Sequence, residues 1–289
     1  MAVPAYQFGI SEFTTNPWPF EEDVTQYAAL GVDTIEVCEA KLDQTNIDAQ
    51  MRLIGEQGLG ISSVQPVTRT LYPSQSQPEP KPLPERLARF RQTIENLGPW
   101  AENAPFVTNL GIPPDGNIQE ALDTAAQDYK ALAQFAEDHG VRIAIEPLNA
   151  AIMNIETAIW TVEQGLELIR AVDHPAFGLC LDFWNVWQNA ALEAAIHACG
   201  DKIFLVQASD WRTPRSFMDR LVPGQGKIPL PALLRAAHDS GYTGPYVVEI
   251  FSDGVPNALW QTDLTQLIKD CRTGLAAAWE QAFDERTHK

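Results

Sequence analysis

The sequence predicts a (β/α)8 TIM barrel that forms a single domain over residues 1–289. Strand-like and helix-like segments alternate along the whole chain, and eight strands can be counted. Four of these strands are short apolar runs, and the last residue of each run carries a carboxylate or an amide. The runs are residues 141–146, 177–182, 203–207 and 246–249. Unbroken apolar runs of this length are typical of strands that are buried on both faces of a parallel sheet.

The spacing of the four polar closing residues also favours one barrel. The intervals from Glu146 to Asp182, to Gln207 and to Glu249 are 36, 25 and 42 residues. A barrel of about 250 residues allots about 31 residues to each strand-helix unit, so each interval holds one unit. A doubly wound open sheet is the competing architecture, but no glycine-rich phosphate loop follows the first strand.

In the first half, apolar strand runs alternate with amphipathic helical segments. Gly31, Gly58 or Gly60, and Gly140 follow expected helices, where glycine is the usual terminating residue. The segment 72–84 is rich in proline, serine and glutamine, and we interpret it as a long loop over the catalytic face that could act as a lid. The expected strands are 8–12, 34–38, 61–67 and 106–110, and the expected helices are 21–30, 47–57, 85–97 and 118–139.

In the second half, the four polar-ended strands alternate with four expected helices. The helices are expected at 155–172, 192–199, 229–240 and 259–283, the last with an interruption near Gly274. No sequence repeat or domain boundary is visible.

The net charge, the cysteine spacing and the lengths of the apolar runs argue against several classes of protein. The net charge is −18, which argues against phosphate-neutralising binding of nucleic acid. The four cysteines show no CxxC spacing, so a disulfide framework is not expected. No signal peptide and no apolar run of membrane-spanning length is apparent, so we expect a cytoplasmic protein without membrane contact.

The four polar strand ends are the candidate metal site. If the strands are neighbours in a barrel, Glu146, Asp182, Gln207 and Glu249 converge at the mouth where barrel enzymes keep their chemistry. Three converging carboxylates repel each other, and a divalent cation removes that repulsion. Oxygen ligands favour Mg²⁺ or Mn²⁺, with Zn²⁺ or Co²⁺ as alternatives. The competing interpretations are buried ion pairs for the glutamates, a helix cap for Asp182 and an ordinary strand-end amide for Gln207.

Five segments in the second half resemble the sugar phosphate isomerase/epimerase family with the xylose-isomerase-like TIM barrel. In order along the chain, they match five segments of that family. The first carries the first metal ligand, the second is a His-Pro…Asp strand, and the third is the strand with the third metal ligand. The fourth is a glycine-rich turn and the fifth is the Tyr-x-Gly…Glu ending. These segments are 146–149, 174–182, 207–210, 223–228 and 242–251. The resemblance runs from about Leu132 to Trp260, whereas the first half fits by topology alone.

The resemblance implies that all four strand ends are metal ligands and that Glu146 and Glu249 also move protons. The family often has histidine at the positions of Asn185 and Gln207, and these departures leave isomerase, epimerase and dehydratase chemistry open. A cation-stabilised enediolate would serve all three reactions.

Other candidates for contact with a small carbohydrate substrate are Glu36, Asn149, Asn185, Asp210 and Arg212. Each has a structural alternative: an ion pair, a turn, or a solvated loop arginine. Arg215 and Arg220 follow the same strand as Arg212. One of the three could bind a substrate carboxylate or phosphate, although each taken singly is expected to be a solvated loop residue.

The leading hypothesis is an isomerase or epimerase of a small sugar or polyhydroxy-ketone. The alternatives are a dehydratase of a keto-polyol such as an inosose or dehydroshikimate, and a sugar-binding barrel without catalysis. A homo-oligomer is compatible with the sequence.

Overall fold

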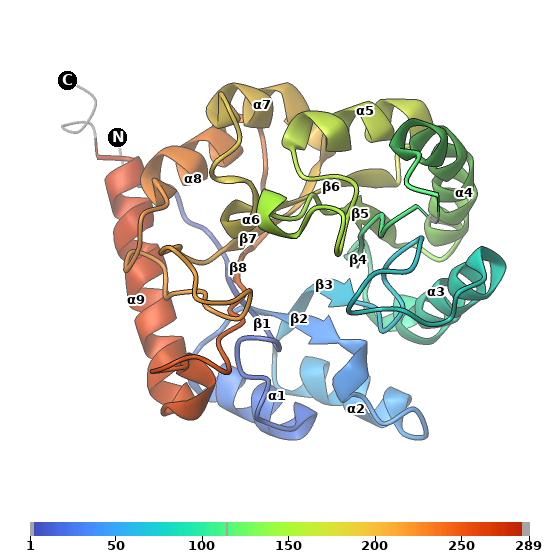
Figure 1. Cartoon of the computed structure of the whole chain (residues 1–289). Helices are drawn as coiled ribbons and strands as arrows, with labels where there is room; N and C mark the ends of the chain where they lie inside the picture. The colour runs from blue at the N-terminus through green and yellow to red at the C-terminus, as the bar shows by residue number, and fades with distance from the viewer. Residues whose placement is uncertain (1–2, 114, 285–289) are drawn as a thin grey trace.

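Eight parallel strands close into a barrel in the computed structural model, which describes residues 3–113 and 115–284. Each strand pairs with its neighbours in the chain, and the last strand pairs with the first, so the expected barrel is confirmed (Figure 1). The strands are β1 (Phe8–Ser11), β2 (Thr34–Cys38), β3 (Gly60–Gln65), β4 (Pro105–Thr108), β5 (Arg142–Ile145), β6 (Phe177–Asp182), β7 (Ile203–Ala208) and β8 (Tyr246–Val248).

A ring of helices surrounds the barrel and buries the outer face of the strands (Figure 1). Side chains that cap the first turn begin several of them: Asn117 accepts from the amide of Glu120, and Thr161 forms a capping box with Gln164. The helices are α1 (Phe20–Ala29), α2 (Ile47–Glu56), α3 (Leu83–Leu97), α4 (Ile118–Asp138), α5 (Val162–Val172), α6 (Phe183–Val186), α7 (Leu192–Cys199), α8 (Leu230–Asp239) and α9 (Leu264–Ala282).

Two expected helices differ in the structure, α9 also begins at Leu264 and not at 259, and the short helix α6 was not expected. The helix expected from Ile155 begins at Val162, because the capping box of Thr161 sets its start and the preceding residues form a loop over the barrel mouth. The helix α9 is continuous through Gly274, so the expected interruption there was wrong. A Cβ atom at Gly274 would lie 2.0 Å from the carbonyl oxygen of Pro223, so this glycine allows a loop to approach the helix closely.

Strand residues alternate between the helix-facing side and the barrel interior. A small apolar cluster, separate from the core under the helices, is contributed by strands β4 to β8: Val107, Ala144, Cys180, Phe204, Leu205 and Val247. Because this cluster is separate from the helix-facing core, we place it inside the barrel. It forms the floor beneath the mouth.

The described residues contain no helix that is both long and apolar enough to cross a membrane. The four cysteines are free and buried.

Candidate metal and active site

The period of the strands places the candidate ligands inside the barrel. Ala144, Cys180 and Val247 belong to the interior cluster, and the residue two positions further along each strand shares its side. Those residues are Glu146, Asp182 and Glu249. The three carboxylates therefore stand on the apolar floor and point into the mouth, and all three are buried.

The three carboxylates meet. One oxygen of each of Glu146, Asp182 and Glu249 lies within 4.8 Å of the others. Arg220 lies among them, and its Nη1 is 2.9 Å from Asp182 Oδ2 and 3.0 Å from Glu249 Oε2. One guanidinium therefore faces three acids, which leaves an excess of negative charge in a buried place.

Burial is the main cause that raises the pKa values of the three carboxyl groups. Burial, and next to it the charge of Asp182, raises the pKa of Glu146 to about 7. Burial also raises the pKa of Asp182 and raises that of Glu249 well above its ordinary value, although Arg220 opposes both shifts. Because their pKa values are raised, the three carboxyl groups tend to take up protons unless a further cation binds among them.

Gln207 lies beside Asp182 in the β6–β7 register, but its amide has other partners in this structure. Its Nε2 donates to both oxygens of Glu36, at 2.9 and 3.0 Å, and its Oε1 accepts from Cys180 Sγ at 3.2 Å. Its role as a metal ligand remains a prediction.

The two asparagines of the predicted substrate set lie next to each other with different tasks. Asn185 donates to Glu146 Oε1 at 2.9 Å and to Asp182 Oδ2 at 2.8 Å, so it aligns two carboxylates. Asn149 donates to the carbonyl oxygens of Trp184 and Asn185 and accepts from Ala151, which is the behaviour of a turn residue.

Asp210 and Arg212 lie away from these carboxylates. The Asp210 carboxylate accepts from the amides of Trp211, Gly224, Gly226 and Ile228, and thereby holds the glycine-rich turn. Arg212 pairs with Asp219 instead of with Asp210. Glu36 is fully buried beneath the mouth, where Ser63 Oγ donates to it at 2.7 Å.

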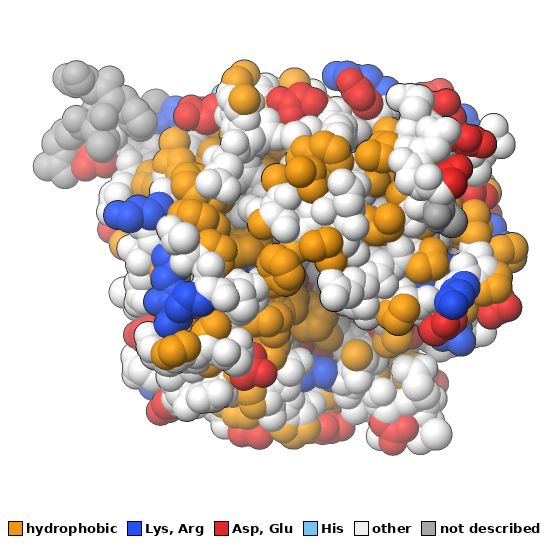
Figure 2. Space-filling model, in the orientation of Figure 1, with side chains coloured by type: hydrophobic (Ala, Val, Ile, Leu, Met, Phe, Trp, Pro, Cys, Tyr) orange, Lys and Arg blue, Asp and Glu red, His pale blue; other side chains and the backbone are white. Residues whose placement is uncertain are grey.

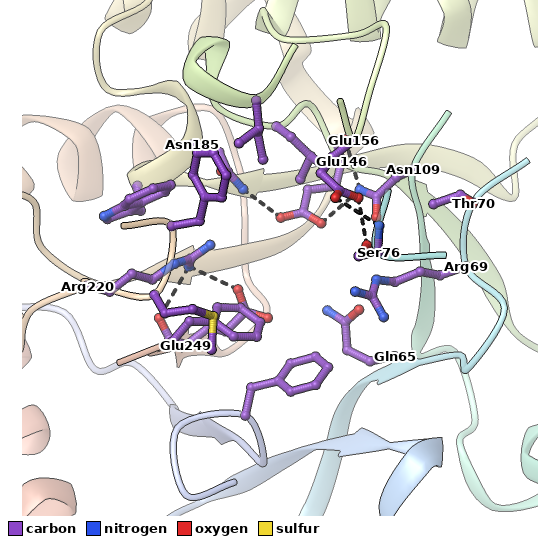
Figure 3. A pocket seen from close by; sticks show the side chains of 17 residues that line it. Gln65, Arg69, Thr70, Ser76, Asn109, Glu146, Glu156, Asn185, Arg220 and Glu249 are labelled. Atoms are coloured by element: carbon purple, nitrogen blue, oxygen red, sulfur yellow. Dashed lines mark hydrogen bonds and ion pairs between the residues drawn. The ribbon is translucent and has the colours of Figure 1, made fainter. Parts of the chain in front are cut away.

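A cavity of about 280 Å³ opens above the carboxylates (Figure 3). Glu146, Glu249 and Asn185 line it, whereas Glu36, Asn149, Asp210 and Arg212 are not among its lining residues in the described part of the chain. Substrate contact at those four positions is a prediction that this geometry does not support.

The other lining residues are Phe13, Gln65, Arg69, Thr70, Ser76, Asn109, Leu148, Ile152, Glu156, Trp184, Phe217, Met218, Arg220 and Phe251. Figure 2 shows hydrophobic side chains around the hollow at the centre of the ring.

Two lining residues that the sequence analysis did not place at the site contact the carboxylates directly. Asn109 directly follows β4 and donates to Glu146 Oε2 at 3.1 Å, so the rule of polar strand ends could have found it. Arg220 was expected to be a solvated loop residue, and this was wrong because the loop folds back over the mouth and buries it. No local pattern distinguishes it from Arg215, which pairs with Asp219 near the surface.

The model of the xylose isomerase-like TIM barrel family matches residues 24–271. The chain belongs to this family. The resemblance noted in the second half of the sequence is thereby extended over most of the chain.

Curated relatives of the chain have several activities. It is 29% identical over 245 residues to a 3-dehydroshikimate dehydratase of Pseudomonas putida, covering 81% of this chain and 36% of that protein. It is 30% identical over 166 residues to an inosose isomerase of Bacillus subtilis, covering 55% of this chain and 57% of that protein. The chain thus spans about a third to a little over half of these relatives. A probable ketose 3-epimerase of Synechocystis and a D-psicose 3-epimerase of Ruminiclostridium cellulolyticum are also among its relatives.

Among solved structures, the IOLI protein with a bound zinc atom superposes with a TM-score of 0.79 at 21% identity. The superposition covers 96% of this chain and 99% of that one, and at this identity it supports the shared fold.

Proposed function

We propose that this protein is a divalent-metal-dependent isomerase or epimerase of a polyhydroxy-ketone. The reaction would move a proton at the carbon next to the carbonyl. The observation that carries this proposal is the meeting of Glu146, Asp182 and Glu249 within 4.8 Å of one another, beside a cavity that Glu146 and Glu249 line. Relatives that are isomerases, epimerases and a dehydratase of keto-polyols support the same chemistry.

The donor set fits a divalent cation. Glu146, Asp182 and Glu249 would hold it, with Gln207 as the fourth proposed ligand, and its charge would relieve the repulsion that Arg220 relieves in part. Oxygen donors favour Mn²⁺ or Mg²⁺, and the zinc atom bound by the IOLI protein keeps Zn²⁺ as an alternative. When bound, the ion would stabilise the negative charge that develops on the substrate oxygens.

Glu146 and Glu249 are the proposed groups that take up and return the proton. They follow different strands, β5 and β8, so they can approach the reacting carbon from two sides. Asn109 and Asn185 each bind one oxygen of Glu146 and fix the orientation of its carboxylate. Without a bound cation the pKa of Glu146 is raised to about 7, and a cation held by this carboxylate would lower the pKa and favour the ionised form that accepts a proton.

The fate of the proton decides the reaction. Its return to the opposite face of the same carbon gives epimerisation, and its return to the neighbouring carbon gives isomerisation. Departure of a hydroxyl from the β carbon as water gives dehydration. The dehydratase is the second candidate, and the match over 81% of this chain to the Pseudomonas enzyme favours it.

The decisive experiment measures proton exchange. The Mn²⁺-loaded protein is incubated in D₂O with ketohexoses, inososes and 3-dehydroshikimate, and deuterium uptake or product formation is followed by NMR. We expect deuterium on the carbon next to the carbonyl for a reversible substrate, or loss of water for a dehydratase substrate. We expect Glu146→Gln and Glu249→Gln to lower the rate at least about a hundredfold, which is typical for loss of a general base.

The matched control is Glu167→Gln on α5, which is remote from the three carboxylates in the described structure and should behave as the wild type. Turnover without deuterium uptake, or a Glu249→Gln variant with normal turnover, would contradict proton transfer. Ligand binding without any turnover on the panel would support a sugar-binding barrel instead.

A further inference from the structure

The wall of the cavity on the side of β3 carries a positive charge that the proposed reaction does not use. Arg69, in the loop after β3, lines the cavity next to Gln65, and Figure 3 shows the two side chains beside each other at the hollow. Gln65 is 3% exposed, and Arg69 is half-buried.

The other arginines around the mouth have partners. Arg220 pairs with Asp182 and Glu249, and Arg212 pairs with Asp219. Arg86, which is buried beneath the same loop as Arg69, donates to the carbonyl oxygens of Thr70 and Pro80.

Arg69 differs from them. Its guanidinium forms no ion pair and no side-chain hydrogen bond with residues 3–113 or 115–284. It makes a cation–π contact with Phe13, with the guanidinium carbon 5.8 Å from the centroid of the ring. The nearby acid Glu156 is already engaged, because the amide and the hydroxyl of Ser76 donate to its two oxygens at 3.0 and 2.6 Å.

We propose that Arg69 binds a carboxylate of the substrate, so that the substrate is a small keto-polyol acid instead of a neutral sugar. This proposal rests on the proposed function and names its substrate class. A guanidinium matches a carboxylate with two parallel hydrogen bonds, and the Gln65 amide can add a donor.

The surroundings fit such a molecule. The cavity volume of about 280 Å³ is near the lower end of the roughly 300–1,000 Å³ of small-molecule pockets, which suits one ring or a short chain. Trp184 and Phe251 offer an apolar wall to the ring carbons. Arg69 and Glu146 line the same cavity, so a carboxylate bound at Arg69 would share that cavity with the Glu146 carboxylate.

A carboxylate suits the site better than a phosphate. Arg220 is engaged by two carboxylates, so Arg69 is the unpaired arginine of the cavity among the described residues. One guanidinium balances the single charge of a carboxylate, whereas a phosphate dianion would leave a charge unbalanced beside three acids.

Calorimetric titration of the Mn²⁺-loaded protein with shikimate and with its methyl ester tests this. The two probes share every ring hydroxyl and differ in the negative charge. We expect shikimate to bind at least about tenfold more tightly than the ester, from the usual strength of hydrogen bonds to a charged group. Arg69→Gln should abolish this preference, and Arg69→Lys should retain part of it because lysine is a point charge without the planar fork.

The control is Arg89→Gln, an exposed arginine on α3, which should keep the wild-type preference. Thermal melting of each variant shows whether it folds. Equal affinity for acid and ester, no detectable binding of shikimate, a preference that survives in Arg69→Gln, or tighter binding of inorganic phosphate than of shikimate would each overturn the proposal.

The proposal and the proposed function fail in different ways. Deuterium exchange into neutral ketoses at rates that Arg69→Gln does not change would overturn the carboxylate site and leave the reaction standing. Charge-dependent binding of shikimate through Arg69 without exchange on any substrate would retain the site and remove the reaction.

Discussion

At the scale of single residues, the environment of Gln207 connects the metal site to the interior of the barrel. Glu36 is fully buried and accepts from the amide of Gln207, which stands beside Asp182 in the sheet. The Gln207 amide is thus held by the Glu36 carboxylate. A substitution of Gln207 therefore affects both the proposed set of metal ligands and a buried acid.

We expect Gln207→Ala to bind Mn²⁺ at least about tenfold more weakly than the wild type, because one ligand is lost and its support with it. Excess Mn²⁺ should restore part of the turnover. Calorimetric titration with Mn²⁺ measures the affinity, and activity as a function of Mn²⁺ concentration measures the rescue.

Gln207→Glu is the matched comparison, since it retains an oxygen ligand at nearly the same position but faces Glu36 with a second carboxyl group. An unchanged Mn²⁺ affinity in Gln207→Ala would remove Gln207 from the ligand set and leave it as a partner of Glu36.

At the scale of elements, the loop from β3 to α3 is held more firmly than its composition predicts. The sequence indicates a polar surface segment, but Arg86 lies under it with 1% exposure and donates to the carbonyl oxygens of Thr70, Gln77 and Pro80. The loop therefore shares the stability of α3, and a deletion that removed Gln77 and Pro80 would also disturb a buried charge.

Gly274 provides a second test at this scale. It lies within α9 and packs against Pro223, whereas Gly55 lies within α2, where a Cβ atom would have no neighbour within 4 Å. We expect Gly274→Ala to lower the free energy of unfolding by about 1–3 kcal/mol, as overpacking does. Gly55→Ala should raise it by about 0.5–1 kcal/mol, because alanine is the better helix former. Denaturant unfolding measures both, and a stabilised Gly274→Ala would show that the loop moves away without cost.

At the scale of the whole molecule, several buried carboxyl groups, around the mouth and on α1, make stability depend on pH in an unusual direction. Burial raises the pKa of Glu146 to about 7 and that of Asp23 to about 6, and it also raises the pKa values of Glu36 and Glu249. The folded state therefore binds more protons than the unfolded state between the ordinary carboxyl pKa and about pH 7.

We expect the chelated protein to lose stability as the pH rises from about 5 to 7. Saturating Mn²⁺ should raise the melting temperature more at pH 8 than at pH 5, because metal ligands must be deprotonated. Melting curves with and without chelator at each pH measure this.

Glu146→Gln is the control, since it removes one raised pKa and should flatten the slope of the chelated protein. A chelated wild type that gains stability between pH 5 and 7 would contradict the raised pKa values.

The sequence by itself determined the architecture and the three carboxylates of the proposed metal site. Apolar runs of strand length identify strands buried on both faces, and their spacing places one in each unit of a barrel. The polar end of each run is a local feature, so Glu146, Asp182 and Glu249 could be recognised without knowing their neighbours, and the structure brings them within 4.8 Å.

The tertiary structure alone decided which loop residues reach the cavity. Arg212, Arg215 and Arg220 have similar local sequence surroundings, yet Arg220 is buried between two carboxylates and the other two share Asp219. Arg69 likewise gains its place from a loop that Arg86 holds from below. Loop positions depend on contacts between segments far apart in the chain, and no periodic pattern encodes them, whereas strand ends are set by the regular repeat of the barrel itself.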